Sequence, residues 1–159
     1  MCRYEDANVK ETTTSGRVTA GFWGCVWSGG TIALERTSPR MNAQEYCGIL
    51  EDVLLPHLNA LFGEGTPVIF MHDNASIHTA RLTQEWFQQH PHITVLPWPP
   101  FSPDLNPIEH VWAMMAKEWR TLRERTVPAL ERHVRDIWRT LERRHQIIGR
   151  IVRSMPQRL

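Results

Sequence analysis

Two acidic residues stand at positions from which they could bind a metal ion together. Asp73 follows the apolar run 68–71, whose β-branched residues are typical of a buried strand. Glu109 comes three residues after Asn106, a favourable helix N-cap, and Pro107 suits the first helical position. Carboxylates from a strand end and a helix start could hold a hard divalent cation through oxygen. A pair of such ions can activate water for phosphodiester chemistry.

Each of these acids also has a simpler structural explanation. An aspartate after a strand often only closes a turn, and a glutamate three residues after a cap is often one half of a capping box. From the spacing alone, these structural roles weigh more than the metal site.

The segment between the two acids must set their separation. After Asp73 the pattern predicts a helix at about 79–89 and then a strand at 93–96. Residues 97–107 contain five of the eleven prolines. Each proline fixes its own backbone angle and disfavours helix in the residue before it. We therefore expect a stiff surface loop that holds Glu109 at a fixed distance from Asp73.

Four stretches around the two acids closely resemble the catalytic core of Tc/mariner-type DDE transposases. They are HDN at 72–74, HTA at 78–80, LPWPP at 96–100 and SPDLNPIEHVW at 102–112. By this resemblance Asp73 is the second catalytic acid and Glu109 the third, and both are metal ligands. Their separation of 36 positions is close to the usual spacing of that family.

The resemblance also implies a fold, a cofactor and partners. The fold is α/β and ribonuclease-H-like, with a mixed sheet flanked by helices. The activity implied is DNA strand cleavage and strand transfer with Mg²⁺ or Mn²⁺, acting on transposon ends and target DNA in the nucleus. A homo-oligomer is compatible with it.

The first catalytic acid of that family has no counterpart in this sequence. In the family it ends a central strand, which pairs with a hairpin on one side and with the strand of the second acid on the other. Glu5 and Asp6 precede the predicted hairpin here without an apolar run before them. We therefore expect the first central strand to be missing and catalysis to be impaired. The isolated chain should be marginally stable, or its split sheet closed by another chain.

The whole chain, 1–159, is expected to form one partial catalytic domain. Within it we predict a polar N-terminal segment (1–16), a β-hairpin (17–36), a helix (42–62), a core with both acids (67–123) and basic C-terminal helices (127–159). Pro56 should kink or restart the helix at 42–62, and Tyr46 belongs to its apolar stripe. In the next helix, Leu82, Trp86 and Phe87 are expected to pack inward.

The net charge of +1 hides an asymmetry between the two ends of the chain. Residues 1–109 hold 6 basic and 12 acidic side chains, a net −6, whereas residues 110–159 hold 12 and 5, a net +7. A basic segment of this kind attracts a phosphate backbone, although a solvated helical face explains it equally well.

Cysteines and histidines give weaker signals. Three scattered cysteines argue against a disulfide framework, and Cys25 is expected to be a small buried hydrophobe. With no long apolar run or leader, we expect a soluble intracellular protein. Histidines 72, 78, 90 and 92 match no zinc spacing. His78 lies one turn beyond Asp73 and could orient the site or contact a phosphate.

Three hypotheses about function remain open. The first is a partial DDE transposase catalytic domain. The second is a non-catalytic DNA-binding or assembly remnant of a transposase. The third is an unrelated ribonuclease-H-like nuclease with a rearranged set of acids.

Overall fold

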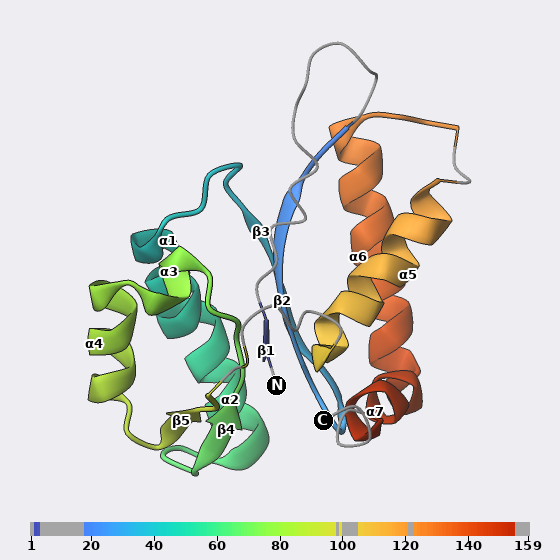
Figure 1. Cartoon of the computed structure of the whole chain (residues 1–159). Coiled ribbons are helices and arrows are strands. Elements are labelled where there is room, and N and C mark those ends of the chain that lie inside the picture. Colours follow the sequence, from blue (N-terminus) through green and yellow to red (C-terminus); the bar gives the residue numbers. More distant parts are fainter. Residues whose placement is uncertain (1, 4–17, 98, 100–104, 121–122, 155–159) are drawn as a thin grey trace.

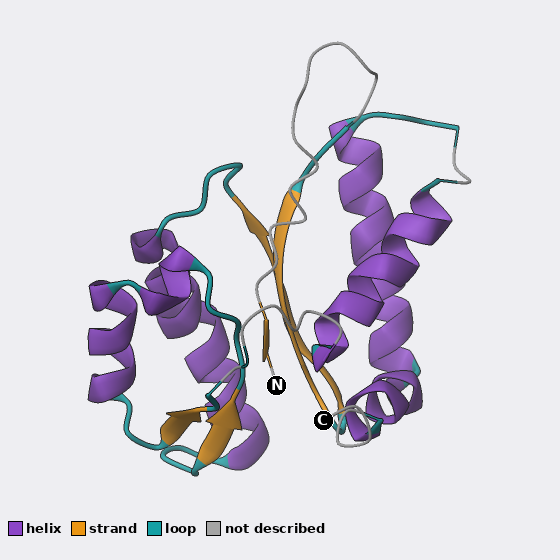
Figure 2. Ribbon diagram, viewed as in Figure 1, coloured by secondary structure: helices purple, strands orange, loops and turns teal. Residues whose placement is uncertain are grey.

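The computed structural model describes residues 2–3, 18–97, 99, 105–120 and 123–154. A long hairpin runs through the middle, and helices cover both of its faces (Figures 1 and 2). The hairpin consists of β2 (Gly21–Trp27) and β3 (Gly30–Thr37), paired antiparallel. The turn between them needs a glycine, because residue 30 has a φ of 140°.

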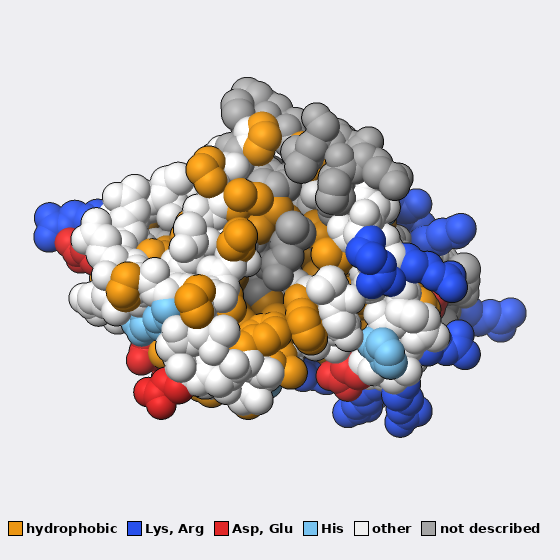
Figure 3. Space-filling model, turned by 90° about the horizontal axis from the view of Figure 1, so that it is seen from below, with side chains coloured by type: hydrophobic (Ala, Val, Ile, Leu, Met, Phe, Trp, Pro, Cys, Tyr) orange, Lys and Arg blue, Asp and Glu red, His pale blue; other side chains and the backbone are white. Residues whose placement is uncertain are grey.

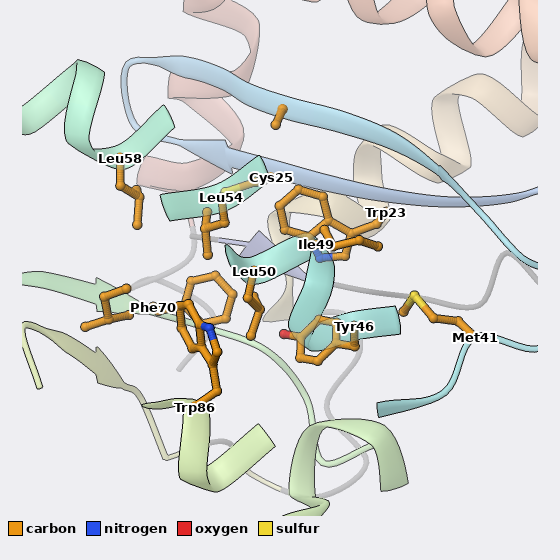
Figure 4. Packing of buried hydrophobic residues seen from close by; sticks show 12 residues of the cluster. Trp23, Cys25, Met41, Tyr46, Ile49, Leu50, Leu54, Leu58, Phe70 and Trp86 are labelled. Atoms are coloured by element: carbon orange, nitrogen blue, oxygen red, sulfur yellow. The ribbon is translucent and has the colours of Figure 1, made fainter. Parts of the chain in front are cut away.

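Strand β2 supplies side chains to two separate hydrophobic cores. Its residues alternate, so that Trp23 and Cys25 enter one core while Phe22 and Val26 enter the other. The first core is formed by Trp23, Cys25, Ala33, Met41, Tyr46, Ile49, Leu50, Leu54, Leu58, Phe70, Trp86 and Ile93 (Figure 4). The second core is formed by Ala20, Phe22, Val26, Ile108, Val111, Met115, Val134, Trp138, Leu141 and Ile148.

The first core lies under a mixed layer of helices and short strands. It contains α1 (Ala43–Ile49), the π-helix η1 (Leu50–Leu54), α2 (Leu55–Phe62), β4 (Val68–Phe70), α3 (Ser76–Thr79), α4 (Arg81–Gln89) and β5 (Ile93–Val95). Asn42 caps α1 as expected, because its side chain accepts a hydrogen bond from Glu45 N–H. Pro56 lies in the first turn of α2 without breaking the helix, and the turn before the proline widens: Leu55 N–H donates to Leu50 C=O.

The second core lies under three helices. These are α5 (Pro107–Trp119), α6 (Val127–Arg143) and α7 (His145–Arg153), which cover the opposite face of the hairpin (Figure 1). Asn106 and Thr126 cap α5 and α6 through their side-chain oxygens, and a proline follows within the first turn of each helix.

The sheet is divided into two parts. The hairpin carries only the two-residue strand β1 (Cys2–Arg3) on its free edge, while β4 pairs in parallel with β5 in a separate two-stranded sheet. No described strand bridges β1 and β4. That the first central strand is missing stays a prediction. Residues 4–17 lie outside the described part of the chain.

Several local expectations are wrong. The run 68–71 was expected to be buried on both faces, but Ile69 is 70% exposed, since β4 packs through one face only. The helix expected at about 79–89 is present as α4, which starts after Ala80 because that residue has an extended backbone with ψ of 146°. Leu82 is exposed because α4 packs inward through Thr83 and Trp86.

The outcome at Cys25 differs in part from the expectation. Cys25 is fully buried, as expected, but it is disulfide-bonded, so the argument against disulfides fails at this position. It lies opposite Cys2 in the β1–β2 register.

Most of the proline-rich loop at 97–107 lies outside the described residues, so its stiffness stays a prediction. Among the described helices, none is long and apolar enough to cross a bilayer.

Two glycines test this packing. A Cβ on Gly24 would lie 3.0 Å from the Trp112 ring and 3.2 Å from the Trp138 ring, whereas a Cβ on Gly48 in α1 would meet nothing within 4 Å. We predict that Gly24→Ala destabilises the chain by roughly 1–3 kcal/mol through overpacking. Gly48→Ala should instead stabilise it by roughly 0.5–1 kcal/mol. Urea denaturation measures both, and equal stability of the two variants would contradict the packing described.

Candidate active site

Asp73 lies just beyond the end of β4, in the turn that leads to α3. Its Oδ1 atom accepts two hydrogen bonds, one from Ala75 N–H at 3.0 Å and one from His78 Nδ1–H at 2.6 Å. The Asp73 side chain is 23% exposed, and the side chain of His78 is fully buried. The carboxylate is therefore held from the protein side and reaches solvent on the other. The sequence had predicted that His78 could orient this acid, and the structure confirms that the two side chains meet.

The side chains of His72 and Tyr46 contact the ring of His78. The rings of His72 and His78 are stacked, with centroids 4.5 Å apart and planes 11° apart. Tyr46, on α1, shares a hydrogen bond of 2.9 Å between its hydroxyl and His72 Nδ1. The Tyr46 ring also lies 4.7 Å from the His78 ring. Sequence reasoning missed this role of Tyr46 and His72, because only the fold brings α1 to the end of β4.

Burial keeps His72 and Tyr46 uncharged. It lowers the pKa of His72 to about 3, with a further lowering by His78 and an opposing effect of Asp73. Burial, and then the neighbouring Cys47 and Asp73, raise the pKa of Tyr46 well above its ordinary value. At neutral pH His72 is therefore a neutral imidazole and Tyr46 a protonated phenol, so neither places a charge behind Asp73.

A hollow of about 440 Å³ opens beside Asp73. Its wall combines acid, amide, hydroxyl and imidazole groups with apolar side chains. The lining residues are His72, Asp73, Asn74, His78, Thr79, Gln84, Phe87, Gln88, Ile93, Val95, Leu96 and Pro97. Glu109 does not belong to this lining.

Glu109 lies in the first turn of α5. Asn106 is 1% exposed; its side-chain oxygen accepts a hydrogen bond from Ile108 N–H at 3.2 Å, and its C=O accepts one from Glu109 N–H at 3.1 Å. Ile108 and Val111 pack into the second core on either side of Glu109 in the sequence. One carboxylate oxygen of Glu109, Oε1, is shielded from solvent. The cap and the packing thus fix where α5 starts, and with it the position of Glu109.

The two acids are therefore positioned by different halves of the molecule. The Asp73 side chain belongs to the network beside the first core, whereas the Glu109 helix packs on the second core, across the hairpin. Among the described residues, no three His, Cys, Asp or Glu side chains gather into a group that could hold a metal ion. That Asp73 and Glu109 share one cation stays a prediction.

The donor chemistry fits a divalent cation at Asp73. Carboxylate oxygens are the ligands that Mg²⁺ and Mn²⁺ prefer. Asp73 is partly open to the hollow and has supporting hydrogen bonds of the kind that orient a metal ligand. A complete site for two ions is not formed by the described residues.

Comparison with known proteins identifies the family. Residues 5–131 match the family described as DDE superfamily endonuclease. The chain belongs to this family. Among its relatives are two transposases of transposable elements: Tcb2 of Caenorhabditis briggsae and Tc1 of Caenorhabditis elegans, both 31% identical to it. The matches cover 99% and 98% of this chain but 56% and 55% of the relatives, so the chain spans about half their length.

Solved structures place this DDE family member beside mariner transposases. The catalytic domain of Mos1 mariner transposase is 25% identical, with a TM-score of 0.76 over 87% of this chain and 70% of that chain. The Mos1 paired-end complex with Mn is 26% identical, with a TM-score of 0.76 over 98% of this chain and 47% of that chain. These likenesses confirm the ribonuclease-H-like fold and the Tc/mariner resemblance.

The low pKa of His72 makes a prediction about stability. The unfolded chain takes up a proton on His72 near pH 6.5, whereas the folded chain does so only near pH 3. Stability is therefore lost as the pH falls below 6.5. Between pH 7.5 and 5.5 this residue should remove about 1 kcal/mol from the free energy of unfolding. We predict that His72→Gln weakens the pH dependence by that amount in urea denaturation at both pH values. Identical pH dependence in wild type and variant would contradict the burial of a neutral His72.

Proposed function

We propose that this chain is part of the catalytic domain of a Tc/mariner-type DDE transposase, acting on DNA. The observation that carries the proposal is the Asp73 carboxylate, held at the end of β4 by His78 beside an open hollow, in a member of the DDE endonuclease family. Support comes also from the structural relatives, which include a Mos1 paired-end complex with the left transposon end and a Mos1 strand transfer complex.

Asp73 and Glu109 would hold the metal ions, which we propose to be Mg²⁺ or Mn²⁺. Bound divalent ions would supply the activation of an attacking oxygen and the stabilisation of a leaving oxygen. Structures of the Mos1 catalytic domain with Mn and with Mg support the choice of ion. In this chain, Asp73 accepts a hydrogen bond from His78, and the cap of α5 places Glu109 in the first turn of that helix.

Cleavage by this chain alone should be impaired. Two carboxylates hold a pair of divalent ions less firmly than three, and the described residues add no third ligand beside Asp73. The proposal is therefore weak, metal-dependent strand cleavage by the isolated chain.

A basic surface on α6 and α7 would bind the DNA backbone. Lys and Arg side chains gather on the side of the molecule formed by the C-terminal helices (Figure 3). Along α6, three arginines pair with acids: Arg132 with Glu124, Arg135 with Glu131 and Arg139 with Asp136. Between residues 143 and 153, at the ends of α6 and α7, four further arginines are exposed and pair with no acidic side chain of the described residues. They are Arg143, Arg144, Arg150 and Arg153.

These four arginines end two consecutive helices. Part of their effect is the favourable interaction of a cation with a helix C-terminus, but their exposure also leaves them available to phosphates.

A nuclear location and a homo-oligomer are further parts of the proposal, and the family alone supports them.

The alternative function is a DNA-binding remnant without catalysis. It is favoured by one observation: the described residues assemble no three-ligand group around Asp73, while the basic surface is intact. Both functions predict salt-dependent binding to DNA, so binding alone does not separate them.

Nicking of supercoiled plasmid separates the two functions. We predict slow nicking by the wild-type chain that requires Mg²⁺ or Mn²⁺ and falls at least about tenfold in Asp73→Asn and in Glu109→Gln, because each variant removes a metal ligand. Glu64→Gln, which makes the same charge change on an exposed loop, is the matched control and should nick like the wild type.

The other outcomes discriminate among the hypotheses. Salt-dependent DNA binding without metal-dependent nicking would favour the remnant. Nicking that survives Glu109→Gln but not Asp73→Asn would favour a nuclease with a different set of acids.

A further inference from the structure

The hydrogen bond between His78 and Asp73 is not needed to close the turn that contains Asp73. The turn itself needs only the bond from Ala75 N–H to Asp73 Oδ1, which is local in sequence. His78 adds a second donor to the same oxygen, from the next helix, at the short distance of 2.6 Å. Two donors on one carboxylate oxygen fix both its position and the plane of the group, so the direction of the other oxygen is fixed as well.

The side chain of His78 is itself held firmly. Helix α3 has only four residues and cannot hold an imidazole in place alone. Instead, the His78 ring stacks on the His72 ring and also contacts the Tyr46 ring, and its side chain is fully buried. Tyr46, on α1 beside the first core (Figure 4), also bonds His72. The orientation of Asp73 is thereby tied to a part of the chain that comes long before it in the sequence.

Two other roles for His78 fit the structure less well. A phosphate cannot reach a side chain with no exposed surface. Direct metal binding through Nδ1 conflicts with the donation of that N–H to Asp73. Orientation of the carboxylate is the role that agrees with burial, distance and donor direction.

We propose that His78 is a positioning residue that orients the Asp73 carboxylate for binding a divalent cation, with His72 and Tyr46 fixing its ring. This inference rests on the proposed function, in which Asp73 is a metal ligand. Groups that support a metal ligand in this way typically change metal affinity 10–100-fold when they are removed.

The test is a Mn²⁺ titration of the full chain, with free Mn²⁺ measured by electron paramagnetic resonance. His78→Leu keeps the approximate volume and removes the donor, whereas His78→Asn places an amide N–H near the position of Nδ1. We expect the dissociation constant for Mn²⁺ to rise at least about tenfold in His78→Leu and to stay within about threefold of wild type in His78→Asn. His57→Leu, on the exposed face of α2, is the control and should bind like the wild type. Near-ultraviolet circular dichroism of each variant reports on the fold.

The possible outcomes distinguish failure of this inference from failure of the proposed function on which it rests. If Asp73→Asn loses Mn²⁺ binding while His78→Leu keeps it, the positioning role is overturned and the metal role of Asp73 stands. If folded His78→Asn binds as weakly as His78→Leu, donation of a hydrogen bond is not what His78 contributes, and the inference is again overturned. If the wild type and Asp73→Asn bind Mn²⁺ equally, the proposed function fails, and the inference fails with it.

Discussion

The two-sided packing of β2 is the constraint on which the rest of the structure depends. Trp23 and Cys25 point into one core and Phe22 and Val26 into the other, so a single strand is the wall between two hydrophobic clusters. Neither helical layer could keep its place without this strand. The close approach of Trp112 and Trp138 to Gly24 shows how little space the second layer leaves against it.

This arrangement determines how the candidate site is built. In the first layer, Asp73 is held by a buried chain of contacts that runs from Tyr46 through His72 to His78. In the second layer, Glu109 is placed by the start of α5, where the buried Asn106 is the N-cap. Any cation that both acids bind must therefore contact both layers.

Local signals in the sequence predicted the features that local physics controls. Asn42, Asn106 and Pro56 act at their own turns, and the hairpin follows from its glycine turn and alternating side chains. The proximity of His78 to Asp73 was also visible, because the two residues are five positions apart. The exposure of Ile69 was not, since an apolar run does not reveal that only one face of its strand is covered. The contacts of Tyr46 with His72 join positions 26 residues apart and come from tertiary packing alone. The separation of the two carboxylates is likewise a property of how the layers pack, which no spacing in the sequence fixes.

The most direct test asks whether one ion touches both halves of the molecule. Substoichiometric Mn²⁺ broadens the amide resonances of nearby residues in an ¹⁵N-labelled chain. The account predicts that the amides of Asn74 and His110, next to the two acids, broaden together at the same low Mn²⁺ concentration. Broadening at Asn74 alone, with His110 unaffected in a folded chain, would contradict it.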